Sequence, residues 1–146
     1  THPAALVIRT SAFFGPWDSS NFLARALEAP AAGKEFTASD DLIVSPTYVP
    51  NLVDASLHLL IDRATGIWHL ANQGGLSWAE LAMRGATLAG VSPHQLRNAS
   101  WRSLALPACR PAYSVLTSER GLLLPALDEA LDRYVAAWRT THSRSG

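Results

Sequence analysis

Two groups of polar side chains in this sequence are suited to ligand binding. The first, Arg9-Thr10-Ser11, follows directly on the apolar run of residues 4–8 and precedes a turn at Gly15-Pro16. A short apolar run with β-branched residues predicts a strand buried on both faces. Ligands of open α/β sheets bind outside the carboxyl ends of strands, so Thr10 and Ser11 lie where a site is expected. The alternative is that these hydroxyls only satisfy turn amides.

The second group centres on Arg110, which stands between Pro107 and Pro111. Two prolines prevent regular structure around this position. An arginine held in a stiffened loop is suited to binding an anionic group through two parallel hydrogen bonds. The alternative is an arginine that pairs with a carboxylate of the protein. The neighbouring Cys109 is interpreted as a small packing residue.

The sequence shows no residue set for catalysis or for a metal. Lys34 is the only lysine. No glycines fall at GxGxxG spacing, so the pyrophosphate loop of a dinucleotide-binding unit is missing. His58 and His69 have no partners at a metal-ligand spacing. The lone Cys109 excludes an internal disulfide. We therefore predict no catalytic and no metal-binding residue in this chain taken alone.

Composition indicates one globular domain without a nucleic-acid or membrane partner. The 146 residues are 48% hydrophobic and 16% charged, and twelve basic residues balance twelve acidic ones. Neither a basic stripe nor a run of membrane-span length is present. The single cysteine and the absence of a signal peptide lead us to expect a cytoplasmic location.

Hydrophobic periodicity and turn residues predict the elements that position the polar groups. We expect strands at about 4–10 and 67–72, and helices at about 20–32, 50–63, 78–90 and 125–140. The strand at 67–72 follows a helix, as the second strand of a right-handed βαβ crossover would. For residues 93–103 we expect a short helix or turn and then irregular chain.

Local signals refine three of the helices. Ser77 and Glu80 form a capping box. The first helix has cap candidates in Asp18-Ser19-Ser20, and Asn21 is either a capping residue or a ligand contact. An apolar face is predicted for helix 50–63 because its large apolar residues recur at helical spacing. These are Leu52, Val53, Leu57, Leu60 and Ile61, with Ser56 among them.

Five stretches in fixed order carry a resemblance to a known family, and together they span nearly the whole chain. The chain resembles the C-terminal half of dTDP-4-dehydrorhamnose reductase and its sugar-nucleotide-binding relatives among the extended short-chain dehydrogenases/reductases. The stretches are Arg9-Thr10-Ser11 with Phe14-Gly15; Asn21-Phe22; Ser45-Pro46-Thr47-Tyr48-Val49; the run from Gly66 to Asn72 with Ser77-Trp78; and Pro107-Ala108 with Arg110-Pro111 and Ser114-Val115-Leu116.

The resemblance implies an α/β fold, the C-terminal part of a Rossmann-like fold with a few parallel strands and about four to five helices. The family reduces the 4-keto group of a dTDP-linked 6-deoxyhexulose with NAD(P)H, using a tyrosine and a lysine four residues later. Since that pair is absent here, we expect the substrate-binding part of such a reductase, inactive alone. NAD(P)H is expected only in a full-length chain, and no tightly bound cofactor is expected on this one.

The resemblance also implies roles for individual residues. Thr10 and Ser11 are implied near the nicotinamide and the sugar, as both cofactor and substrate contacts. The remaining substrate-binding residues are implied to be Asn21 on the sugar nucleotide, Ser45 and Thr47 on the nucleotide side, and Arg110 on a diphosphate oxygen. One departure is Ala12, where the family commonly has a sugar-contacting tryptophan; alanine permits a different or bulkier sugar.

Two other interpretations stay open. The chain is alternatively a degenerate, non-catalytic sugar-nucleotide-binding module fused to another sugar enzyme, or a structural or oligomerisation domain. A strand at residues 4–8 without a neighbour on one side would leave an apolar edge open to pairing. The expected partners are therefore a dTDP-linked 6-deoxyhexose and either a missing N-terminal half or a second copy of the chain.

Overall fold

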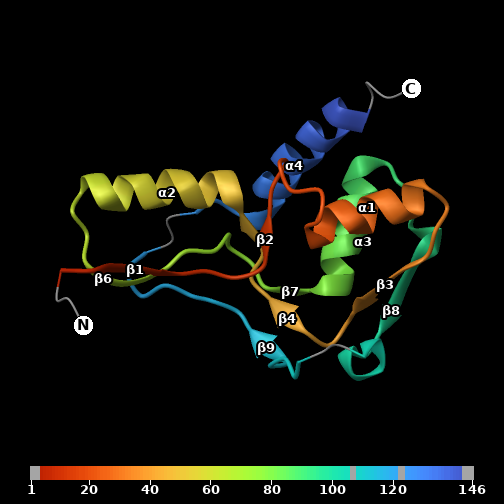
Figure 1. Cartoon of the computed structure of the whole chain (residues 1–146), viewed down its shortest axis with the longest axis horizontal. Coiled ribbons are helices and arrows are strands. Elements are labelled where there is room, and N and C mark those ends of the chain that lie inside the picture. The colour runs from red at the N-terminus through yellow and green to blue at the C-terminus, as the bar shows by residue number, and fades with distance from the viewer. Residues whose placement is uncertain (1–3, 106–107, 122–123, 143–146) are drawn as a thin grey trace.

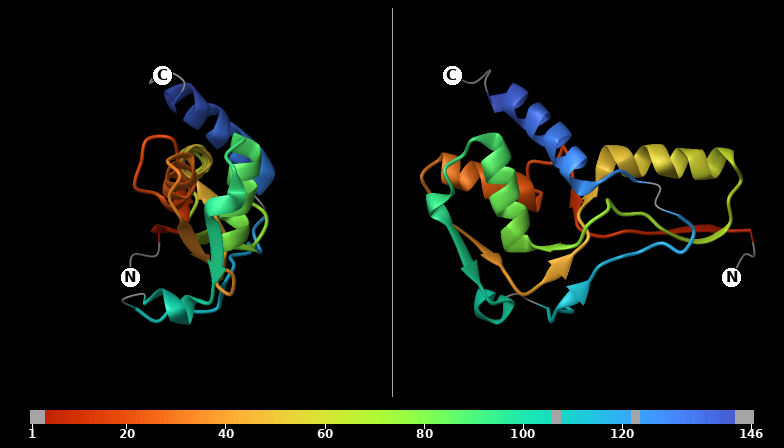
Figure 2. Two further views of the ribbon diagram at one scale, coloured as in Figure 1. Left: turned by 90° about the vertical axis from the view of Figure 1, so that its right-hand side faces the viewer. Right: turned by 180° about the vertical axis from the view of Figure 1, so that it is seen from behind.

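The structure, a computed structural model, describes residues 4–105, 108–121 and 124–142. Pro107, one of the two prolines flanking Arg110, lies outside the described residues. The molecule is elongated, with a narrow arm at one end and a thicker body at the other (Figures 1 and 2). The arm consists of β1, α2 and β6, and the body holds the other three helices. No helix in the described ranges is long and apolar enough to span a bilayer.

The described residues form four α-helices and nine short strands. Single turns of 3₁₀ helix at Pro93–Gln95 and Trp101–Leu104 lie on either side of β8. The helices are α1 (Phe22–Ala31), α2 (Val49–Ile61), α3 (Trp78–Ala89) and α4 (Leu127–His142). The strands are β1 (Leu6–Arg9), β2 (Phe13–Phe14), β3 (Phe36–Ser39), β4 (Ile43–Val44), β5 (Thr47–Tyr48), β6 (Gly66–His69), β7 (Leu76–Ser77), β8 (Leu96–Ala99) and β9 (Tyr113–Ser114).

Most strand pairs are parallel, as the α/β prediction requires. β1 pairs with β6, with Ile8 opposite Trp68, and α2 directly precedes β6 in the long connection between the two strands. β2 pairs with β5 and β3 with β8, also in parallel. β4 lies between antiparallel β7 and parallel β9. The prediction of irregular chain within residues 93–103 was wrong, because β8 occupies part of this range. The sequence Leu-Arg-Asn-Ala has little strand character, and it forms a strand because it pairs with β3.

The first strand is not buried on both faces, and that prediction was wrong. In the described part of the chain β1 has one strand neighbour, β6. Its residues alternate, so that Leu6 and Ile8 face the arm's small core while Val7 is 46% exposed. A continuous apolar run predicts cover on both faces, but here only α2 covers the β1–β6 pair, and it packs on one face.

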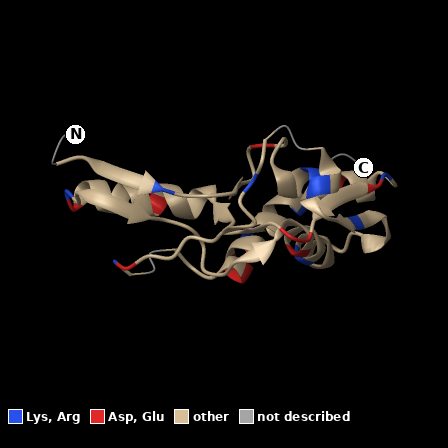
Figure 3. Ribbon diagram, turned by 90° about the horizontal axis from the view of Figure 1, so that it is seen from below, with Lys and Arg blue, Asp and Glu red and all other residues tan. Residues whose placement is uncertain are grey.

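Helix α2 buries a different face from the one its spacing favours. Asn51, Ala55 and Leu59 are buried, whereas Leu57 is 52% and Leu60 60% exposed. The apolar spacing was read correctly as helical, but periodicity does not say which apolar residues meet a partner. The helix is apolar on more than one side, and the described chain covers only the side toward β1 and β6. In the view of Figure 3 most of the arm carries no charge.

The body is built on close contact between α1 and α3. A Cβ atom at Gly85, inside α3, would lie 2.5 Å from Leu23 of α1, so this glycine is a packing requirement. The predicted capping box is confirmed: the Ser77 hydroxyl accepts from the Glu80 amide, and Glu80 accepts from the Ser77 amide. α4 closes the core with an apolar stripe. Its buried members are Leu127, Ala130, Leu131, Tyr134 and Val135.

One buried side-chain amide joins the arm to the body. The Asn72 oxygen accepts from the Tyr48 amide at 2.8 Å, where α2 begins. Its nitrogen donates to the Asn51 side chain at 3.3 Å and to the Pro125 carbonyl at 3.0 Å, just before α4. Asn72 is 2% exposed, so these groups have little access to water.

The Asn72→Ala variant should lose about 2 to 4 kcal/mol of unfolding free energy, because it leaves several buried polar groups without partners. Urea denaturation measures this loss. The matched control is Asn98→Ala, at an exposed position of β8, which should change stability by less than about 0.5 kcal/mol. Equal losses in the two variants would contradict the role of Asn72.

Candidate functional site

A large hollow lies beyond the carboxyl end of β1. It has a volume of about 710 Å³ and is enclosed by the turn after β1, α1, β3, β4, the start of α3 and the segment leading to β9. Ser11, predicted as a site residue, lines this cavity together with Arg110, although the two are far apart in sequence. Ala12 lines the same cavity in a left-handed conformation with φ of 45°.

Three aromatic side chains make one wall of this cavity. The Phe22 ring lies 4.5 Å from Trp78 and 5.4 Å from Phe36, measured between ring centroids. They come from α1, α3 and β3, so packing in the body builds the wall. Sequence reasoning did not assign these residues a site role, although Phe22 and Trp78 stand within the family stretches. A flat apolar wall beside polar groups suits a ligand with both a ring and charge.

Three other predicted site residues contact protein groups rather than the cavity. The Thr10 hydroxyl donates to the Thr47 hydroxyl at 3.3 Å, and Thr47 is fully buried. Ser45 is 1% exposed and accepts from the Leu116 amide at 2.9 Å. These bonds tie the strand end after β1 to β5, and the segment after β9 to the start of β5. None of the three residues is among those lining the cavity.

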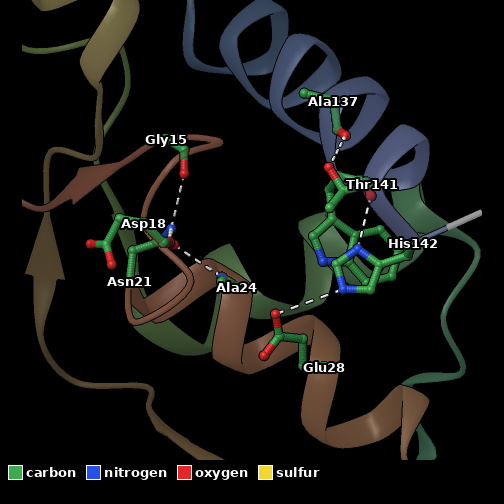
Figure 4. Close-up of polar contacts among 9 residues, drawn as sticks. Gly15, Asp18, Asn21, Ala24, Glu28, Ala137, Thr141 and His142 are labelled. Carbon is green, nitrogen blue, oxygen red and sulfur yellow. Dashed lines mark hydrogen bonds and ion pairs between the residues drawn. The ribbon is translucent and has the colours of Figure 1, made fainter. Parts of the chain in front are cut away.

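Asn21 is the N-cap of α1. Its side-chain oxygen accepts from the Ala24 amide at 3.0 Å, and its nitrogen donates to the carbonyl groups of Gly15, at 3.1 Å, and Asp18 (Figure 4). The predicted alternative that Asn21 is a capping residue is confirmed, whereas the candidates Asp18-Ser19-Ser20 do not cap the helix. The Asp18 carboxylate instead accepts from Ser20, which lowers the pKa of Asp18, and the turn places Asn21 at the cap.

The same turn packs against a buried phenol of α4. Burial raises the pKa of Tyr134 to about 12, and a hydrogen bond with the Asn21 side chain opposes part of this rise. Tyr134 also packs edge-on against Phe14, at 5.6 Å between centroids. Figure 4 shows a second link between α1 and α4, where His142 lies 3.8 Å from Glu28. α4 therefore contacts α1, the helix that contributes two residues to the cavity lining, and the Asn21 cap before it.

Few of the described side chains are placed for acid–base catalysis or for metal binding. Tyr48 and Tyr134 are buried in the core, and Lys34 is exposed in the turn between α1 and β3. Within the described ranges no group of three His, Cys, Asp or Glu side chains could hold a metal ion. Cys109 is exposed, so its interpretation as a packing residue was wrong.

These features define an α/β protein of the Rossmann-like class, with a cavity at the carboxyl end of a parallel strand. The RmlD substrate binding domain matches residues 1–140, and the chain belongs to that family. It is 34% identical over 141 residues to dTDP-4-dehydrorhamnose reductase of Mycolicibacterium smegmatis, covering 92% of this chain and 43% of that protein. It is 32% identical over 119 residues to the Streptomyces griseus reductase, covering 78% of this chain and 39% of the relative.

Solved structures give the same result for the fold. The crystal structure of dTDP-4-dehydrorhamnose reductase from Bacillus anthracis in complex with NADP matches with a TM-score of 0.83 at 27% identity, covering 90% of this chain and 48% of that one. The Clostridium acetobutylicum enzyme also matches with a TM-score of 0.83, at 23% identity, covering 92% and 49%. The chain thus spans about half or less of each relative's length.

Burial of Tyr134 predicts a specific loss of stability in alkali. Its pKa is about 12 in the folded chain against about 10 unfolded. The neutral phenol therefore stabilises the fold fully below pH 10, and this contribution is lost as the pH rises toward 12. Between pH 9 and 12, wild type should lose about 2 to 3 kcal/mol more unfolding free energy than Tyr134→Phe.

Urea titrations at several pH values measure this difference. The exposed Tyr113 provides the matched control, because Tyr113→Phe should keep the wild-type dependence on pH. A Tyr134→Phe variant that declines in parallel with wild type would contradict the assignment.

Proposed function

We propose that this chain is the sugar-nucleotide-binding part of a dTDP-4-dehydrorhamnose reductase-like protein. In a full-length chain it would serve the NAD(P)H-dependent reduction of a 4-keto-6-deoxy sugar nucleotide. The observation that carries the proposal is the cavity at the end of β1, which Ser11 and Arg110 line beside an aromatic wall. Membership of the RmlD substrate binding domain family and the names of the relatives support it.

The proposed roles follow from where the side chains lie. Arg110 is assigned to a phosphoryl oxygen, because it lines the cavity and has no carboxylate partner in the described chain. Ser11 contacts the sugar and the nicotinamide side. Thr10, Ser45 and Thr47 support the site through the hydrogen bonds that join β1, β5 and the segment after β9. Asn21 positions α1 and the turn before it.

The reduction itself is proposed for a longer chain. No tyrosine here stands four residues before a lysine, and the sequence has no dinucleotide-binding glycine motif. NADP is present in the B. anthracis reductase structure, and NAD in that of the dTDP-glucose 4,6-dehydratase of the same organism. We propose that NAD(P)H binds between this chain and a preceding half, and that Thr10 and Ser11 contact it from this chain. We also propose a cytoplasmic location for the protein.

The arm is the proposed surface for that half. The outer face of α2 and the free edge of β1 expose apolar side chains that nothing in the described structure covers, among them Val7, Val53, Leu57 and Leu60. The same surface supports a second candidate, in which the chain is a non-catalytic sugar-nucleotide-binding or oligomerisation module. In that case a second copy of the chain pairs along β1.

Calorimetric titration with dTDP, dTDP-rhamnose and NADPH tests the binding function. We expect both dTDP ligands to bind and NADPH not to bind this chain alone. Arg110→Ala should weaken dTDP about 10- to 100-fold, the worth of one charge-assisted contact. The control is Arg84→Ala, which removes an exposed helix arginine outside the cavity and should leave the affinity unchanged. Equal affinities of wild type and Arg110→Ala would contradict the role of Arg110.

Sedimentation equilibrium tests the strand edge. The isolated chain should form dimers, and Val7→Lys should shift it toward monomer because a lysine on an edge strand opposes pairing. Val53→Lys, at an equally exposed position of α2, should leave the dimer intact if the strand edge forms the contact. A monomeric wild-type chain at all concentrations would exclude pairing along β1.

A further inference from the structure

The charges around the cavity are all of one sign. Among the described residues that line it, Arg25 and Arg110 are the only charged side chains, and no Asp, Glu or His faces the same space. Arg25 comes from α1 and Arg110 from the segment before β9, so the two cations reach the cavity from separate elements. The remaining lining is aromatic, aliphatic or hydroxylic.

The guanidinium N–H groups of Arg25 and Arg110 make no hydrogen bond within the described part of the chain. Elsewhere, Arg84 pairs with Asp128 at 3.1 Å and Arg97 with Glu35 at 2.8 Å. In the described part of the chain the guanidinium groups of Arg25 and Arg110 have no ion pair and no hydrogen bond. Two guanidinium groups without counter-charges beside one cavity leave their forked donors available to an anionic ligand.

Arg25 is nevertheless held in place. It lies one turn beyond the Asn21 cap, and its guanidinium carbon is 6.0 Å from the centroid of the Phe36 ring. Phe36 packs edge-on against Phe22, which contacts Trp78. A cation over an aromatic face is oriented by the ring without using its N–H groups. The aromatic wall therefore presents Arg25 at the cavity rim with all its donors free.

We propose that Arg25 is a phosphate-binding residue that, together with Arg110, makes the cavity select ligands with two phosphoryl groups over ligands with one. The proposal rests on the proposed function, that this cavity binds a sugar nucleotide. One phosphoryl group satisfies one guanidinium bidentately and leaves the second without a partner. A diphosphate offers an anionic group to each, so the second arginine adds affinity only when the second phosphoryl group is present.

The experiment compares dTDP, dTMP and inorganic pyrophosphate by calorimetry on wild type, Arg25→Gln, Arg25→Lys and Arg84→Gln. Wild type should bind dTDP at least tenfold more tightly than dTMP. Arg25→Gln should weaken dTDP and pyrophosphate about tenfold or more and dTMP less than threefold. Arg25→Lys keeps the charge without the fork and should fall between. Arg84→Gln should match wild type for all ligands, and thermal unfolding checks that each variant is folded.

Each other outcome rejects a definite statement. If Arg25→Gln binds dTDP as wild type does, Arg25 has no role and the proposed function stands. If it weakens dTDP and dTMP equally, Arg25 contacts what the two ligands share, and selection by the second phosphoryl group is overturned. If wild type binds pyrophosphate but not dTDP, the two-arginine site stands and the nucleotide function fails. Binding of none of the three overturns both.

Discussion

The buried amide of Asn72 is the interaction on which the rest of this structure depends. It follows β6 and bonds the backbone where α2 begins and where α4 is about to begin. A carboxylate or an alkyl group could not both donate and accept there, so the position needs an amide. Because the arm and the body have separate apolar cores, this hydrogen-bonded junction fixes how β1 delivers its carboxyl end to the cavity.

The cavity itself is a product of helix packing in the body. Its aromatic wall combines α1, α3 and β3, and α1 and α3 approach closely because Gly85 has no side chain. The hydroxyl groups of Ser45 and Thr47 make hydrogen bonds within the protein, to the Leu116 amide and the Ser45 carbonyl respectively. The side chains that line the cavity and the supporting hydroxyl groups are thus distinct sets. The supporting set is buried, and the arginines stand at the rim, where a charged ligand can reach them.

Sequence reasoning predicted the parts of this structure that local chemistry determines. The helices lie near their predicted ranges because apolar spacing and caps such as Ser77 and Glu80 are local signals. Two-residue strands such as β2 and β5 carry no such signal and exist only through pairing with distant chain. Ser11 and Arg110 could be singled out because a strand end and a proline-flanked arginine are recognisable, and both line the cavity. Arg25, which lines it too, was not singled out because a lone helix arginine resembles any solvent-exposed one until its neighbours are known.

The free surface of the arm has a thermodynamic consequence for the cavity. The arm's own core is small, with Ala55, Leu59, Leu70 and Leu124 as its buried members, so we expect the arm to open more readily than the body with its larger core. Since β1 continues directly into Thr10 and Ser11, opening the arm also disorders one side of the cavity. If the cavity binds a ligand as proposed, a partner that covers α2 and β1 would raise the affinity for that ligand, and ligand binding would strengthen the partner's binding by the same factor. The two surfaces are coupled through four residues of strand, without a moving domain.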